Sequence, residues 1–137
     1  MKKGLIPAAI MLLALACRSG AGADVIAPVK DSTTVQILDT AYDFGKATEG
    51  EKVSFSYRFK NTGDKPLIIQ NATASCGCTK PTWPTEPVPP GATATVKAEF
   101  NTEGRRGPAY KIIHVYSNAK PAFPPLKLTG IVVPKGS

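Results

Sequence analysis

The chain contains 137 residues, with 13 prolines and 12 glycines among them. This length is enough for one compact domain with a modest hydrophobic core. Because proline and glycine recur along the chain, the composition disfavours a helical domain and favours short strands joined by turns. The net charge of +7 comes without a long basic run or an acidic tail. Because the chain begins with an export signal, described next, we do not expect nucleic acid as a partner.

The first residues have the three parts of a secretory signal peptide. Lys2 and Lys3 form a positive leader, an apolar run follows over residues 4–16, and Cys17 comes next. A cysteine directly after small and apolar residues resembles a bacterial lipobox, in which the cysteine is lipid-modified and becomes the new N-terminus. We therefore predict a lipoprotein signal peptide over residues 1–16 and lipidation of Cys17.

A lipid anchor would hold the protein in the cell envelope without a transmembrane helix. The apolar run is shorter than the roughly 20 residues that a spanning helix needs. We expect the protein on the cell membrane or the outer membrane, facing the periplasm, with the small and polar residues 17–32 as a flexible tether. Ala14 stands where leucine is commonest in a lipobox, so ordinary cleavage near Ala21 or Ala23 stays open.

Seven stretches after the tether are predicted to be strands, separated by turn residues. They are residues 33–38, 42–45, 53–59, 67–69, 94–100, 109–117 and 126–133. The clearest pattern is the alternation of Val53, Phe55, Tyr57 and Phe59 with polar residues. Residues 94–100 alternate in the same way. A period of two puts the apolar set on one face of each strand and the polar set on the other.

Half-buried strands at this spacing are typical of two antiparallel sheets packed face to face. We therefore predict an all-β sandwich of about seven strands, forming a single domain over residues 33–137. The prolines from Pro81 to Pro90 are expected to keep their segment extended and unpaired, because proline lacks the N–H group that a sheet uses.

Several short motifs carry a family resemblance over residues 35–133. They are Tyr42-Asp43-Phe44-Gly45, Lys60-Asn61-Thr62-Gly63, Leu67-Ile68-Ile69, Ser75-Cys76-Gly77-Cys78-Thr79, Val88-Pro89-Pro90-Gly91, Phe100-Asn101-Thr102 and Val115-Tyr116-Ser117-Asn118. Together they resemble an exported bacterial family known as domain of unknown function 1573. Members of this family are often exported lipoproteins. The resemblance implies an immunoglobulin-like fold, similar to that of the major-sperm-protein and hydin class. It implies no reaction.

Cys76 and Cys78 are the cysteines that remain if Cys17 is acylated. In an exported protein such a pair is expected to form a disulfide or to be packed as small residues. An extended Cys-x-Cys segment places its side chains near the limit of bridging. Gly77 would relieve this by adopting a positive φ.

Two other interpretations of the pair stay open. Two reduced thiolates one residue apart can chelate a soft ion such as Cu(I), with the single histidine, His114, as a further candidate metal ligand. Alternatively, the pair acts as a dithiol exchanger. It lacks the Cys-x-x-Cys spacing at a helix N-terminus that lowers the pKa of a thiol.

Trp83, Arg105 and Arg106 are candidate contacts for a partner. Trp83 lies among prolines and is either an exposed aromatic contact or a cap on the open end of the core. Arg105 and Arg106 lie between two glycines. They either contact a partner or a phosphate, or carry solvated charge at the tip of a hairpin.

The sequence lacks the signatures of an enzyme. The chain contains a single histidine, and no glycine-rich phosphate loop follows a strand and precedes a helix. We expect no catalysis and no cofactor, and predict an envelope lipoprotein with a binding or scaffolding domain. It would bind a protein partner at an exposed sheet edge or through the loops around Cys76–Trp83. The alternative is a periplasmic copper-binding or thiol-redox protein that acts through Cys76 and Cys78.

Overall fold

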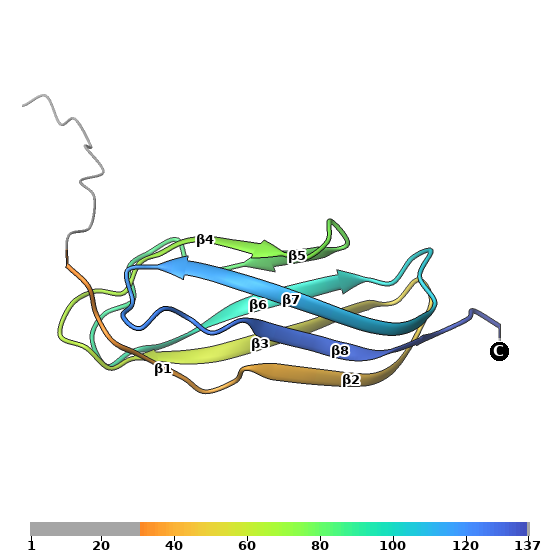
Figure 1. Cartoon of the computed structure of the whole chain (residues 1–137), viewed down its shortest axis with the longest axis horizontal. Helices are drawn as coiled ribbons and strands as arrows, with labels where there is room; N and C mark the ends of the chain where they lie inside the picture. The colour runs from red at the N-terminus through yellow and green to blue at the C-terminus, as the bar shows by residue number, and fades with distance from the viewer. Residues whose placement is uncertain (1–30, 137) are drawn as a thin grey trace, which may run out of the picture.

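The computed structural model describes residues 31–136, which form eight strands (Figure 1). The strands are β1 (Val35–Ile37), β2 (Ala41–Thr48), β3 (Lys52–Asn61), β4 (Ile69–Ala74), β5 (Thr79–Thr82), β6 (Thr93–Asn101), β7 (Gly107–Ser117) and β8 (Leu126–Val133). Within this range, no helix has the length and apolarity to span a membrane. The predicted signal peptide, Cys17 and nearly all of the tether lie outside the described residues.

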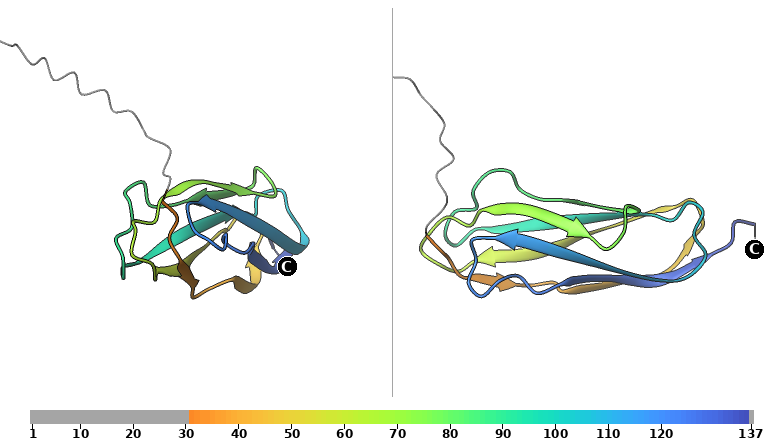
Figure 2. Two further views of the ribbon diagram at one scale, coloured as in Figure 1. Left: turned by 60° about the vertical axis from the view of Figure 1, so that its left-hand side comes forward. Right: turned by 45° about the horizontal axis from the view of Figure 1, so that its top comes forward.

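The strands form two four-stranded sheets that lie face to face (Figure 1, Figure 2). One sheet has the order β1-β3-β6-β5 and the other has the order β2-β8-β7-β4. The predicted all-β sandwich is confirmed, with eight strands in place of about seven. The strand pairs are antiparallel except for β2 and β8, which are parallel. The sheets differ from the predicted antiparallel arrangement only in this pair, since β2 and β8 run in the same direction.

The end of β5, at Pro81 and Thr82, lies in the segment that is predicted to stay unpaired. It pairs antiparallel with β6, and Pro81 lies opposite Ala98. The prediction fails because it treats proline as incompatible with a sheet. β5 is the edge strand of its sheet, where the missing N–H group of proline can face outward without breaking a ladder hydrogen bond.

The apolar faces of β3 and β6 form the centre of the core. Tyr57 and Phe59 are 1% exposed, and Val96 is fully buried. Tyr57 lies opposite Val96 in the register of the two strands, as the alternation predicts. The second sheet contributes Ile113, Val115, Leu126, Leu128 and Val132. Burial of each large apolar side chain contributes about 1.5–3 kcal/mol, so this interface is the main source of stability.

Two buried asparagines hold the loops at the end of the sandwich where residue 31 enters, which we call the proximal end (Figure 1). The Asn118 side chain accepts a hydrogen bond from Ile68 N at 2.8 Å and donates to Pro66 O at 2.9 Å. Asn61 makes a similar set of hydrogen bonds within the same end. Both residues come from the motifs that carry the family resemblance, so these motifs have a structural role.

Gly63 is needed at the proximal end because there is no room for a side chain. A Cβ atom at this position would collide with the Thr33 side chain and lie 2.7 Å from Thr34 N. The Asn-Thr-Gly motif therefore combines a buried amide with a close approach of two backbone segments.

Candidate functional site

The chain crosses from one sheet to the other between β4 and β5, and both cysteines lie in this crossing. Ser75 N donates a hydrogen bond to Ile112 O in β7, and Asn101 N in β6 donates to Cys78 O, each at 2.9 Å. The crossing, residues 75–78, is therefore bonded to both sheets. We call it the disulfide turn. It lies toward the distal end of the sandwich, opposite residue 31 (Figure 2).

A disulfide joins Cys76 and Cys78. Their Cα atoms are 5.3 Å apart, within the usual range for a bridge. The chain turns at this point, and Thr79 N donates to Cys76 O at 3.3 Å. Gly77 is not among the glycines with a positive φ, so the expectation that it relieves the bridge in this way is wrong. It is exposed, and an added Cβ atom would contact nothing within 4 Å.

The disulfide turn covers the distal part of the core. Both cysteines are half-buried. Cys78 packs against a small cluster of buried residues formed by Phe100, Leu128 and Val132. The turn therefore has an inner side that contacts the core and an outer side that faces solvent.

The β6–β7 loop, residues 102–106, lies beside the disulfide turn and is held by a buried threonine. The hydroxyl of Thr102 donates to Glu51 O at 2.6 Å and accepts from Gly50 N at 3.0 Å. These bonds tie the loop to the turn that connects β2 in one sheet with β3 in the other. Arg105 N then donates to Thr102 O at 3.0 Å, so the backbone that carries the two arginines is fixed from a buried position.

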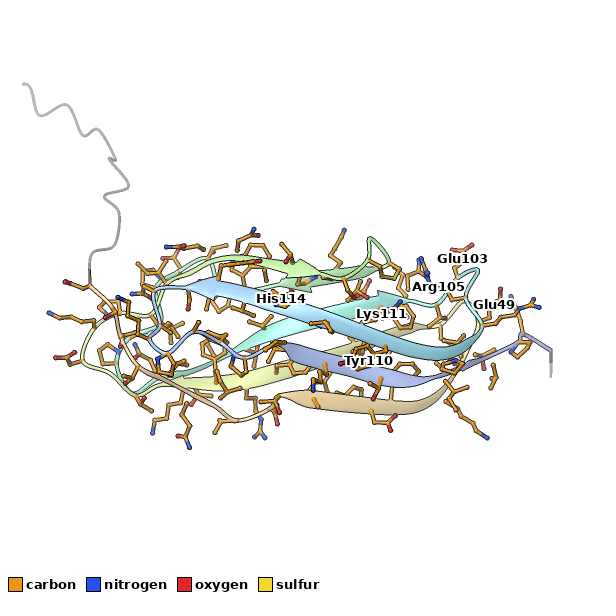
Figure 3. The ribbon with its side chains drawn as sticks, viewed as in Figure 1. Glu49, Glu103, Arg105, Tyr110, Lys111 and His114 are labelled. Atoms are coloured by element: carbon orange, nitrogen blue, oxygen red, sulfur yellow. A yellow bond between two sulfur atoms is a disulfide. The ribbon has the colours of Figure 1, made fainter. Side chains whose placement is uncertain are left out.

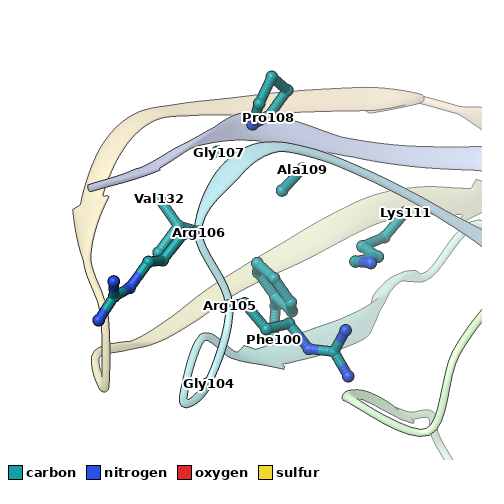
Figure 4. Close-up of a pocket in the computed structure, with 9 residues that line it drawn as sticks. All are labelled: Phe100, Gly104, Arg105, Arg106, Gly107, Pro108, Ala109, Lys111 and Val132. Atoms are coloured by element: carbon teal, nitrogen blue, oxygen red, sulfur yellow. The ribbon is translucent and has the colours of Figure 1, made fainter. Parts of the chain in front are cut away.

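Two adjoining hollows open at the distal end, and Arg105 lines both. The first is lined by Gly77, Cys78, Asn101, Glu103 and Arg105. The second has a volume of about 260 Å³ and is lined by the β6–β7 loop and by the start of β7 (Figure 4). Its other lining residues include Phe100, Ala109, Lys111 and Val132.

Lys111 is the residue of this site that sequence analysis missed. It belongs to the inward set of β7, with Ala109 before it and the fully buried Ile113 after it. Its Nζ atom lies 5.3 Å from the centre of the Phe100 ring. Burial and the nearby charge of Arg105 lower the pKa of Lys111. The sequence did contain a signal for this residue, because Lys111 interrupts the apolar alternation of its strand.

The structure separates most of the other candidate residues from the disulfide turn. His114 is exposed on the opposite side of β7 from Lys111 and lies across from Thr73 of β4 (Figure 3). Among residues 31–136, no three histidine, cysteine, aspartate or glutamate side chains come together as a metal site. The proposed set of Cys76, Cys78 and His114 is therefore not assembled in this structure.

Trp83 and Arg106 also point to places other than the disulfide turn. Trp83 is half-buried against the main core, and it lines a separate hollow with Thr95 and Lys97. Arg106 forms an ion pair with Glu49, with Nε 2.8 Å from Oε2. Arg105 is the one of the three predicted contact residues that shares a hollow with Cys78.

The two stacked sheets define an immunoglobulin-like β-sandwich, and solved structures match this fold. The PapD-like domain 7 of human CEP192 matches with a TM-score of 0.56 and 11% identity, over 84% of this chain and 97% of that one. A protein of unknown function from Porphyromonas gingivalis W83 matches with a TM-score of 0.63 and 16% identity, over 77% of this chain. This chain spans 50% of that protein's length.

The secreted serine protease VesC from Vibrio cholerae also matches, with a TM-score of 0.53 and 14% identity, over 73% of this chain and 23% of that one. At these identities the likeness shows the fold alone. The sequence matches the model of a family described as protein of unknown function (DUF1573) over residues 35–132, and the chain belongs to this family. None of the curated proteins matches it. Function therefore has to be inferred from the site.

The state of the cysteine pair is directly measurable. Mass spectrometry of the unreduced protein is expected to show one bridge between Cys76 and Cys78, and two free thiols would contradict it. The bridge closes a very short loop, so its reduction is expected to lower the free energy of unfolding by only about 1–2 kcal/mol.

If the copper hypothesis holds, the reduced protein binds Cu(I) and the Cys78→Ser variant does not. Equal binding by both would end that hypothesis.

Proposed function

We propose that this protein is a non-enzymatic lipoprotein of the cell envelope, and that its immunoglobulin-like domain binds a partner protein at the distal end. The observation that carries the proposal is the pair of adjoining hollows between the disulfide turn and the β6–β7 loop, with Arg105 in both. Binding residues are commonly found on loops that a rigid scaffold holds in place. Here the disulfide and the buried Thr102 hydroxyl hold the two segments.

The sheet edges favour the loops over strand addition as the binding mode. β1 has three residues, and β5 has four, one of which is Pro81. β2 has a register shift between Asp43 and Lys46, and β4 has one between Ile69 and Asn71. Short edge strands, proline and bulges all discourage pairing with another chain. The strand-addition mechanism is therefore the weaker of the two candidates.

The position of the distal end also supports the proposal. Residue 31 enters at the proximal end, whereas the β6–β7 loop lies at the other end of the long strands (Figure 1). An eleven-residue strand such as β7 spans about 36 Å. If Cys17 is lipidated, the anchor and the proposed binding surface are on opposite ends of the domain, and the surface is free to meet a partner away from the membrane.

The proposal predicts that a bulky charge on the disulfide turn blocks partner capture. Gly77→Arg adds a long side chain where the structure leaves open space and requires no positive φ, so the fold is expected to be unchanged. In vivo cross-linking followed by affinity purification from membranes should recover a specific partner with the wild type and lose it with Gly77→Arg. Metabolic labelling with palmitate tests lipidation of Cys17 separately.

Thr85→Arg is the matched control. It introduces the same side chain at an exposed position in the loop between β5 and β6, away from the distal end. Capture should match that of the wild type. Equal capture by both variants would contradict a binding surface at the distal end, and equal loss in both would contradict its specificity.

A further inference from the structure

The second distal hollow contains a lysine that points between the two sheets. The inward positions of β7 are otherwise small or apolar, including Ala109, Ile113 and Val115, and Lys111 occupies the position in their middle. Its ammonium group lies over the face of Phe100, which is fully buried. Inward charges are rare in sandwich interiors unless they are paired, because removal of a charge from water is costly.

Neither Lys111 nor Arg105 has an acidic partner among residues 31–136. The ion pairs in this range join Lys52 to Glu99, Arg58 to Asp39 and Arg106 to Glu49. The lining of the hollow contains Arg105, Arg106 and Lys111 and no carboxylate. Because Arg106 is neutralised by Glu49, two uncompensated positive charges remain. Glu103, the acidic residue of the same loop, lines the two neighbouring hollows and not this one.

The positive charges of Arg105 and Lys111 disfavour each other. The charge of Arg105 and the partial burial of Lys111 both lower the pKa of the lysine, so its charged form is less stable here than in water. An anion bound between the two groups would compensate both costs through its attraction to the two charges. An arginine fork and a lysine ammonium together are the donors that proteins commonly use for phosphate oxygens.

We propose that Arg105 and Lys111 bind a phosphate-class oxyanion in the hollow above Phe100 (Figure 4). A phosphate dianion matches the two uncompensated charges, whereas a carboxylate leaves one of them unbalanced. The hollow is open to solvent and large enough for the oxyanion to be free or to carry an ester group. This site goes beyond the proposed function, because it requires no partner protein.

Isothermal titration calorimetry of the full chain with inorganic phosphate, at low ionic strength and about pH 8, where phosphate is a dianion, tests the site. We expect saturable binding that weakens with added sodium chloride. Arg105→Gln and Lys111→Gln should each weaken binding by about tenfold or more, because each removes a charge-assisted hydrogen bond. Lys97→Gln, at an exposed position on β6 beside Trp83, should leave the affinity unchanged.

Two further measurements complete the test. Phosphate should raise the thermal stability of the wild type and of Lys97→Gln but not that of Lys111→Gln, since a ligand stabilises only a fold that binds it. Glycerol 3-phosphate in place of phosphate separates an esterified ligand from the free ion, according to which binds more tightly. The proposal is overturned if phosphate does not bind saturably, if acetate binds as tightly, or if all variants weaken binding equally. Partner capture is measured separately, so either proposal can fail while the other stands.

Discussion

Replacement of Asn61 by alanine is expected to lower the free energy of unfolding by about 3–5 kcal/mol, since each buried group left without a partner costs about 1–3 kcal/mol. Asn61 is fully buried. Its Nδ2 atom donates to Lys65 O at 2.7 Å and to Val88 O at 2.9 Å. Its Oδ1 atom accepts from the Thr33 hydroxyl at 2.9 Å and from Gly63 N at 3.1 Å. The side chain therefore joins the turn that follows β3 to two distant segments of the proximal end, at Thr33 and at Val88.

The expected loss is large in relation to the total stability of a small domain, which is typically about 5–15 kcal/mol. Urea denaturation of the wild type and of the variant measures it. Asn101→Ala is the matched control, because Asn101 also precedes a threonine but its side chain accepts only an exposed hydrogen bond, from Glu103 N. The control should lose less than about 1 kcal/mol. A similar small loss in Asn61→Ala would show that the buried amide does not hold the proximal end.

The stability of the domain is expected to decrease as the pH rises from 10 to 12, and Tyr57 is expected to cause part of that decrease. Tyr57 is 1% exposed, and its hydroxyl donates to Lys127 O at 2.7 Å. Burial raises the pKa of Tyr57 from 10.0 to about 12. The folded protein therefore keeps this proton up to about pH 12, whereas the unfolded chain releases it near pH 10. Between these values the unfolded state binds fewer protons, so stability is lost as the pH rises.

One unit of pKa corresponds to about 1.4 kcal/mol, so the contribution of Tyr57 that disappears between pH 10 and pH 12 is about 3 kcal/mol. Denaturation of the wild type and of Tyr57→Phe at several pH values isolates it, because the other titrating groups are common to both proteins. Their difference in stability should be constant below pH 10 and should shrink above it. Tyr110→Phe, which removes an exposed hydroxyl, is the matched control. A constant difference between the wild type and Tyr57→Phe up to pH 12 would contradict the raised pKa.

The strands with a clean alternation could be predicted because the alternation is local. Phe55, Tyr57 and Phe59 need one buried face whichever strand lies beside them, so β3 follows from the order of residues along the chain. β5 could not be predicted in this way. Whether Pro81 can lie in a strand depends on whether that strand is at an edge, and the edge position is a property of the whole sheet. The parallel pairing of β2 with β8 likewise could not be predicted, because it joins two segments that are far apart in the sequence.

The residues of the distal site could also be predicted only in part from the sequence. Cys76 and Cys78 stand out in the sequence because cysteine is rare and reactive, and Arg105 stands out because it lies in a glycine-flanked loop. Lys111 did not stand out, because a single lysine in a strand usually lies on the solvated face. The site exists because residues 75–78 and the β6–β7 loop, which are more than 20 residues apart in the sequence, meet at the same end of the sandwich.

Local sequence patterns were sufficient to predict the all-β class, the two central strands of the core and the family. The alternation and the short motifs each involve residues that are close together in the sequence. The folded arrangement was needed for the pairing of β2 with β8, for the separation of His114 and Trp83 from the cysteines, and for the meeting of Arg105 with Lys111. These features depend on which distant segments become neighbours. That outcome is set by burial of the whole apolar surface and not by any one segment.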